Sequence, residues 1–138
     1  MTFLLDTNIV SELWKPEPAQ PVLQFVRQAE WWLPLVVIAE IQEGAERAAS
    51  MARRGEINAR LDAFLRDHSA LIVPWNAAVA RTWGRLAHSP EVRRQPQALW
   101  DSLIDAMAVE MSAAVATRNR TDFRHARTFD PFVDSLPA

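Results

Sequence analysis

The stretch TFLLDTN, residues 2–8, places a short apolar run directly before three polar residues. An apolar run bounded by turn-forming side chains predicts a buried strand over residues 2–5, followed by a polar turn at Asp6. Residues 9–14 continue at helical spacing, and the prolines that follow end this helix. A buried strand that leads through a polar turn into a helix is typical of an α/β domain with a mostly parallel sheet.

Apolar runs and helical patterns continue to alternate along the chain. Residues 31–33 fit either a short strand or the end of a helix. Further strands are expected at residues 70–75, 113–117 and 127–129. Helices are expected from Pro21, from Pro34, through residues 57–65, over 76–86 with Asn76 as the N-cap, and over 98–111. Polar loops are expected at residues 88–96 and 118–124.

Composition limits the classes of protein that this chain can be. Its 138 residues fit one compact domain, 1–138, and 49% of them are apolar, which is enough for a core. The absence of cysteine excludes disulfides, thiolate metal sites and cysteine nucleophiles. The sequence shows no secretory signal and no apolar run long enough to span a membrane, so a cytoplasmic protein is expected. The net charge of −2 gives no support to nucleic-acid binding.

Polar residues follow two of the expected strands. Asp6 follows the first, and Asn119 and Asp122 lie just beyond the strand that ends near Thr117. Each of them taken alone is compatible with ordinary turn chemistry. Because ligands of open α/β sheets bind beyond the carboxyl ends of the strands, these two clusters are expected to meet at one edge of the sheet.

Two helices supply further carboxylates. Asp101 lies at the edge of the apolar stripe of the helix over 98–111 and is expected to be partly covered. Asp105 lies one turn later and is expected to point further toward water, as a solvated helix charge. Glu40 follows five apolar residues, which is an unusual place for a carboxylate, and Glu43 is the alternative acidic residue in this segment.

A metal site follows if these carboxylates converge. Two carboxylates about 4 Å apart repel each other by roughly 4 kcal/mol at an effective dielectric near 20, so a proton or a cation must relieve the repulsion at Asp6, Glu40 and Asp101. Oxygen ligands without histidine or cysteine suit Mg²⁺ or Mn²⁺. One or two such ions polarise a phosphoryl oxygen and activate water, so phosphodiester hydrolysis is the expected chemistry.

Two other classes of phosphate or hydrolase chemistry fit the sequence poorly. Receiver domains and aspartate-nucleophile phosphatases need a late lysine, and the only lysine is Lys15, near the start of the chain. A Ser-His-Asp hydrolase needs a positioned histidine. His68, His88 and His125 lie in polar stretches without a nucleophile-elbow motif, so solvated surface roles are expected for them.

Five segments, in order, resemble a PIN-domain toxin of the VapC type. They are LLDTNIVSE at residues 4–12, AEIQEG at 39–44, DSLIDA at 101–106, ATRNRTDF at 116–123 and TFDP at 128–131. The resemblance covers nearly the whole chain and implies a PIN-like three-layer α/β fold with helices on both faces of the sheet. It also implies a Mg²⁺-dependent endoribonuclease, with Mn²⁺ as a possible substitute, that acts on RNA, is held inactive by a cognate antitoxin and forms a homodimer.

The resemblance assigns roles residue by residue. Asp6 and Asp101 would be the main metal ligands, and Glu40 and Asn119 would complete the catalytic centre. The residues expected to support this centre, or to add acidic groups to it, are Thr7, Asn8, Glu43, Asp105 and Asp122. Asp105 departs from the family pattern, in which a small residue is common. Arg118 and Arg120 are candidate RNA contacts.

An inactive PIN-like interaction module is the alternative. Such a module would keep the fold and bind a protein partner without cleaving RNA. It predicts no dependence on divalent cations and no loss of function when Asp6 is changed.

Overall fold

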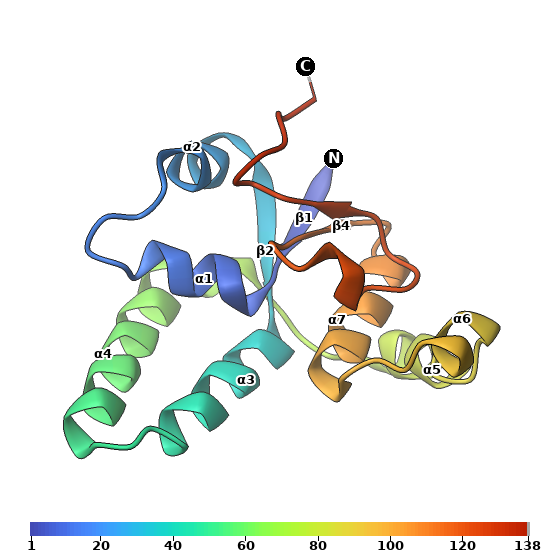
Figure 1. Cartoon of the computed structure of the whole chain (residues 1–138), viewed down its shortest axis with the longest axis horizontal. Helices are drawn as coiled ribbons and strands as arrows, with labels where there is room; N and C mark the ends of the chain where they lie inside the picture. Colours follow the sequence, from blue (N-terminus) through green and yellow to red (C-terminus); the bar gives the residue numbers. More distant parts are fainter. Residues whose placement is uncertain (138) are drawn as a thin grey trace.

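The computed structural model describes residues 1–137, and their five strands form one parallel sheet in the order β3-β2-β1-β4-β5. The strands are β1 (Thr2–Leu5), β2 (Glu30–Pro34), β3 (Ile72–Val73), β4 (Ala114–Ala116) and β5 (Thr128–Phe129). The helices are α1 (Thr7–Leu13), α2 (Gln20–Gln28), α3 (Leu35–Glu46), α4 (Met51–Asp67), α5 (Ala77–Leu86), α6 (Pro90–Arg94) and α7 (Leu99–Glu110). This arrangement confirms the predicted α/β class (Figure 1).

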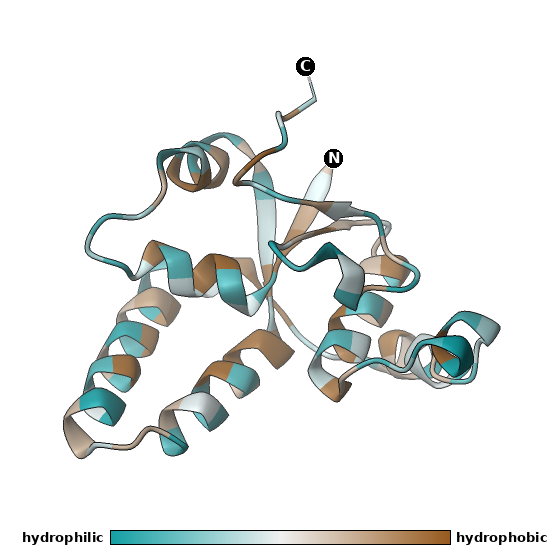
Figure 2. Ribbon diagram, viewed as in Figure 1, coloured by the Kyte–Doolittle hydropathy of each residue, from teal (hydrophilic) through white to brown (hydrophobic). Residues whose placement is uncertain are grey.

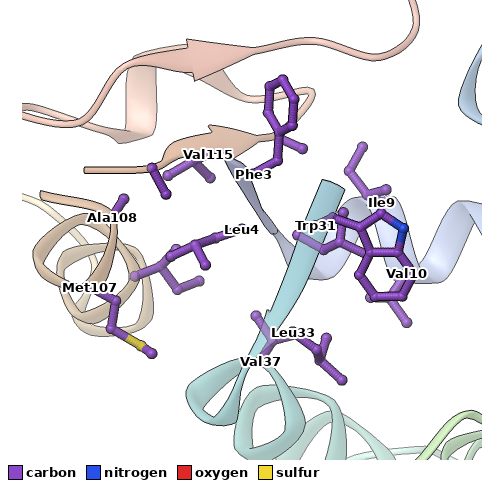
Figure 3. Close-up of a cluster of buried hydrophobic side chains, with 14 of the residues drawn as sticks. Phe3, Leu4, Ile9, Val10, Trp31, Leu33, Val37, Met107, Ala108 and Val115 are labelled. Atoms are coloured by element: carbon purple, nitrogen blue, oxygen red, sulfur yellow. The ribbon is translucent and has the colours of Figure 1, made fainter. Parts of the chain in front are cut away.

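The central strand β1 is buried on both faces, as its continuous apolar run predicts. Its side chains alternate: Phe3 packs edge-on against Phe25 of α2, with ring centroids 5.1 Å apart. Leu4 lies on the opposite side, toward Met107 of α7 (Figure 3). Helices therefore cover both faces of the sheet. The hydropathy view agrees, with apolar residues on β1 and on the first turn of α3, and polar residues prominent on α4 (Figure 2).

Local sequence signals set several element boundaries. Asn76 Oδ1 accepts a hydrogen bond from Val79 N at 2.9 Å, which confirms it as the N-cap of α5. Residues 31–33, which fitted a strand or a helix end, lie within β2. In place of a longer strand over 70–75, a 3₁₀ turn at Ser69–Leu71 leaves only the two residues of β3.

The prediction of an irregular loop over residues 88–96 is wrong. These residues contain α6, whose N-cap Ser89 accepts from Val92 N through its side chain, and Pro90 occupies the first helical position. Residues 118–124 also contain a 3₁₀ turn, Arg120–Asp122. Within residues 1–137, no helix has the length and apolar character that crossing a membrane requires.

Candidate active site

The carboxyl ends of β1 and β4 meet at one edge of the sheet. Leu5 of β1 pairs with Ala116 of β4, and Asp6 N donates to Ala116 O at 3.0 Å. Strands β2 and β4 flank β1 on opposite sides, so this edge is the point at which the chain order of the sheet reverses. An open pocket of about 520 Å³ lies here. It is lined by Asp6, Thr7, Asn8, Ser11, Glu12, Lys15, Glu40, Asp101, Arg118, Asn119 and Asp122.

Asp6 is the most firmly held carboxylate of the pocket, with only 4% of its surface exposed. Its Oδ2 accepts from Thr117 Oγ1 at 2.7 Å and from Asn8 Nδ2 at 3.1 Å, and its Oδ1 accepts from Thr7 N at 2.8 Å. Burial raises the pKa of Asp6, and the hydrogen bonds from Thr117 and Thr7 oppose that rise. Asp6 is also the N-cap of α1, and this role helps to fix the direction of its side chain.

Glu40 reaches the pocket from α3, which is separated from Asp6 by more than thirty residues of chain but is adjacent to it in space. Thr7 Oγ1 donates to Glu40 Oε1, so one side chain next to Asp6 holds the second carboxylate in place. Burial raises the pKa of Glu40, and the nearby charge of Asp6 raises it further. Thr7 thus connects the two carboxylates.

Asp101 enters the pocket from α7 and is half-buried, as its position at the edge of the apolar stripe predicts. Burial, followed by the charges of Asp6, Asp122 and Glu40, raises its pKa to about 7. Among the hydrogen bonds of residues 1–137, none involves the Asp101 carboxylate. A carboxylate that is crowded by like charges and lacks donors favours a proton or a cation as its partner.

Asn119 and Asp122 come from the loop after β4. Thr117 Oγ1 accepts from Asn119 N at 3.0 Å, and Asn8 Oδ1 accepts from Arg118 N at 3.1 Å. Asn8 Nδ2 also donates to Thr117 Oγ1 at 3.2 Å. The side chains that follow the two strand ends therefore join the loops into one unit, and the structure brings Asn119 and Asp122 to the same pocket as Asp6, Glu40 and Asp101.

Sequence reasoning assigned no role in the site to Thr117, to the α1 residues Ser11 and Glu12, or to Lys15 just beyond α1, although all four belong to this region. Thr117 is fully buried and bonded directly to Asp6. Its position immediately after β4, which ends beside β1, is the feature of the sequence that could have indicated this contact. Ser11 and Glu12 lie about one helical turn beyond Asn8 on α1, so helical spacing indicated that they share its face.

Two other residues predicted to support the site lie outside the pocket. Glu43 accepts from Trp100 Nε1 at 3.1 Å and pairs with Arg47. The expectation that Asp105 is a solvated charge is wrong, because its side chain is 1% exposed and accepts the backbone N–H groups of residues 124–126. It does not line the pocket.

His125 is likewise not the solvated residue that its polar surroundings predicted. Its side chain is 15% exposed, with Nδ1 3.1 Å from Asp105 Oδ2 and Nε2 3.0 Å from Ser89 Oγ. Three segments that are separate in the sequence meet at this ring. A sequence pattern that treats each segment alone could not reveal the contact.

The two candidate RNA-binding arginines differ in position. Arg118 lines the pocket, and its guanidinium lies over the Phe132 ring at 4.1 Å from the centroid. Arg120 pairs with Asp134 and does not line the pocket. Lys15 adds a second cation at the pocket and pairs with Glu12 at 2.8 Å.

The donor chemistry of the pocket fits a hard divalent cation. Carboxylate, amide and hydroxyl oxygens converge, without histidine or cysteine, which is the set that Mg²⁺ and Mn²⁺ prefer. Within residues 1–137, no three acidic, histidine or cysteine side chains stand close enough together to form a complete cation site as they lie. The match is therefore one of donor type and charge.

The sequence comparison identifies the family. The model of the PIN domain matches residues 3–128. The chain belongs to the PIN-domain family. It is 28% identical over 127 residues to the VapC ribonuclease Y4jK of Sinorhizobium fredii, covering 89% of this chain and 91% of the relative. It is 26% identical over 137 residues to the toxin FitB of Neisseria gonorrhoeae, covering 95% and 99%.

Solved structures show the same PIN fold. The crystal structure of FitAcB from Neisseria gonorrhoeae superposes with a TM-score of 0.77 at 24% identity and covers 95% of this chain and 99% of that one. A toxin–antitoxin complex from Klebsiella pneumoniae gives a TM-score of 0.66 at 20% identity, covering 93% and 96%. The predicted PIN-like fold is confirmed.

Proposed function

We propose that this PIN-domain protein is an endoribonuclease toxin of the VapC type, dependent on a divalent cation and neutralised by a cognate antitoxin. One observation carries the proposal: Asp6, Glu40, Asp101 and Asp122, from separate parts of the chain, line one open pocket, where burial and then the charges of the other three raise the pKa of Asp101 to about 7. Two relatives, a VapC ribonuclease and the toxin FitB, support the same function.

Asp6, Glu40 and Asp101 are the residues that would hold Mg²⁺ or Mn²⁺, with Asn119 and Asp122 beside them. When bound, such a cation supplies charge neutralisation at a scissile phosphate and activation of a water molecule. The protein supplies the orientation. Thr117, Asn8 and the backbone N–H of Thr7 fix both oxygens of Asp6, so its direction is set before any ligand arrives.

The cations at the pocket provide a way to bind the RNA backbone. Arg118 and Lys15 line the pocket together with the carboxylates and carry the positive charge that a phosphodiester needs there. Phosphate contacts of this kind position the substrate without reading its sequence. They also offset the repulsion between the carboxylates and the polyanion.

The same charge distribution suggests how an antitoxin neutralises the enzyme. The carboxylates of Asp6, Glu40, Asp101 and Asp122 attract an arginine or lysine side chain, which would fill the space and neutralise the charge that a cation needs. An antitoxin stripped of its basic residues should then lose inhibition. Full inhibition by that variant would contradict this route. The homodimer that the family resemblance implies stays a prediction.

An RNA-cleavage assay tests the proposed function. Purified protein is incubated with mixed structured RNA in Mg²⁺, in Mn²⁺ and in EDTA, beside an Asp6→Ala/Asp101→Ala double variant. Asp62→Asn, on the exposed face of α4, is the matched control because it removes a carboxylate outside the pocket. Cleavage that needs the cation, survives in the control and disappears in the double variant supports the proposal.

The inactive interaction module remains the alternative outcome of this assay. It predicts that neither RNA cleavage nor cation binding is found in the wild-type protein. Cation binding without cleavage points instead to a narrow RNA specificity, which is then sought by sequencing RNA ends in cells that express the protein.

A further inference from the structure

Asp105 is a buried carboxylate that the proposed chemistry does not use. Its Oδ1 accepts from Ala126 N at 2.8 Å, and its Oδ2 accepts from His125 N at 3.2 Å and from Arg124 N at 3.3 Å. Burying a charge is costly unless donors compensate it, and here the donors are consecutive backbone N–H groups. The contact therefore fixes the turn at residues 124–126 against α7.

This turn follows the loop that brings Asn119 and Asp122 to the pocket. Gln97 Nε2 donates to Asp122 O at 2.9 Å and to Asp105 Oδ2 at 3.3 Å, so one amide connects the buried carboxylate to the backbone of Asp122. Asp101 lies one turn before Asp105 on the same helix. Helix α7 thus presents Asp101 to the pocket and holds the loop that presents Asp122.

Arg124 strengthens the same connection from the loop side. Its Nε donates to Gln95 O at 2.8 Å and its Nη2 to Pro96 O at 3.1 Å, and its Nη1 donates to Thr121 O. The residues just before α7 and the loop after β4 are therefore joined by side-chain and backbone contacts over several residues. We call Asp105, Gln97, Arg124 and His125 the loop clamp.

His125 extends the loop clamp to α6. Its Nε2 lies 3.0 Å from Ser89 Oγ and 3.6 Å from the Glu91 carboxylate. The contacts from Ser89 through His125 to Asp105 resemble those of a serine-hydrolase triad. However, Ser89 Oγ also caps α6 by accepting from Val92 N. The Glu91 carboxylate beside Nε2 would oppose a developing oxyanion. The arrangement braces the loop rather than activating a nucleophile.

We propose that Asp105 is a positioning residue for the acidic pocket: by holding residues 124–126 and, through Gln97, Asp122, it sets the affinity of the pocket for a divalent cation. This inference rests on the proposed function, because it assumes that the pocket binds a cation. Asp105 itself contacts neither the cation nor the RNA. Its effect passes through the position of the loop.

Mn²⁺ titration in the absence of RNA tests the proposal. Asp105→Asn keeps the side-chain volume but directs an amide N–H₂ at the donors that the carboxylate accepted. We expect the Mn²⁺ affinity measured by calorimetry to fall by about ten-fold, with faster hydrogen exchange at the amides of residues 124–126. Gln97→Ala removes the amide that links Asp105 to Asp122 but keeps the three backbone donors of Asp105, so it should give a smaller loss of affinity in the same direction.

Thr82→Val is the matched control. Thr82 is 4% exposed and donates to Glu110 Oε2 at 2.6 Å, so the variant loses a polar contact between α5 and α7 in which no residue of the loop clamp takes part. It should lower the melting temperature and leave the Mn²⁺ affinity unchanged. If Asp105→Asn does not fold, Gln97→Ala carries the test.

Two results would overturn the proposal, and they differ. Wild-type Mn²⁺ affinity in the folded Asp105→Asn and Gln97→Ala proteins, despite faster exchange at residues 124–126, would restrict the loop clamp to a structural role. Failure of the wild-type protein itself to bind Mn²⁺ would overturn the proposed function, and the role of Asp105 with it.

Discussion

Asp101 and Asp105 lie one turn apart on α7, yet the protein treats their charges in opposite ways. Asp105 is almost fully buried and satisfied by backbone donors, whereas Asp101 is half-buried, lacks hydrogen-bond donors within residues 1–137 and faces three other carboxylates. A carboxylate with donors stabilises the fold. A crowded carboxylate without donors costs stability, and such groups cluster at functional sites.

Replacing Asp101 should give the largest change in activity. Asp101→Asn keeps the shape of the side chain but removes a charge that the proposed cation needs, so RNA cleavage should fall by about a thousand-fold or more. Single-turnover cleavage in Mn²⁺ measures the effect. Equal activity in the wild-type and variant proteins would remove Asp101 from the catalytic centre.

Replacing Asp105 should give the largest change in stability. Asp105→Asn turns several satisfied backbone N–H groups into unsatisfied or opposed ones, and its free energy of unfolding should fall by about 3 kcal/mol. Chemical denaturation measures this quantity, with Asp62→Asn as the control for loss of an exposed carboxylate. A loss below the scatter of the control would show that the donors find other partners.

The sequence predicted the environment of Asp101 but not that of Asp105. Helical spacing correctly placed Asp101 at the edge of the buried stripe, and strand ends correctly predicted where Asp6 and Asn119 would meet. The same spacing put Asp105 toward water, because its donors come from residues 124–126, twenty residues later. Spacing within one helix carries no information about a distant loop that covers it.

Other differences have a similar cause. The helix α6 was missed because its five residues are too short for a periodic pattern, although Ser89 and Pro90 form an ordinary helix start. Thr117 was not given a role because its hydrogen bond to Asp6 joins the ends of two strands that are far apart in the sequence. Local signals therefore predicted most elements and the acidic residues, whereas the supporting contacts needed the tertiary structure.

A buried threonine at the pocket and another on α5 sharpen the comparison between site and scaffold. Thr117→Val removes the hydrogen bond from Thr117 Oγ1 to Asp6 Oδ2, and the cleavage rate should fall by about ten-fold because Asp6 loses its fixed direction. Thr82→Val removes a hydroxyl that is also buried but lies on α5. Similar rates for the two variants would contradict the positioning role of Thr117.

The dependence of stability on pH should be the smallest effect. Because the folded state raises the pKa of Asp101 to about 7 from an ordinary 3.8, it holds this proton more tightly than the unfolded chain does. The free energy of unfolding should therefore fall as pH rises from about 4 to 7 in EDTA, and level off above that. Asp101→Asn should flatten this slope and melt a few degrees higher than the wild type at pH 8.

The opposite slope would contradict the crowding of carboxylates at the pocket. A stability that rises across this window and is unchanged by Asp101→Asn would mean that other groups dominate. Thermal unfolding at several pH values, with both proteins in the same buffers, separates these outcomes.

Calorimetric titration of Mn²⁺ into the wild-type, Asp101→Asn and Asp62→Asn proteins at pH 8, without RNA, tests the central claim most directly. We predict saturable binding to the wild type and to Asp62→Asn, and its loss in Asp101→Asn. Equal binding to all three proteins, or binding to none, would contradict the assignment of a cation to the acidic pocket.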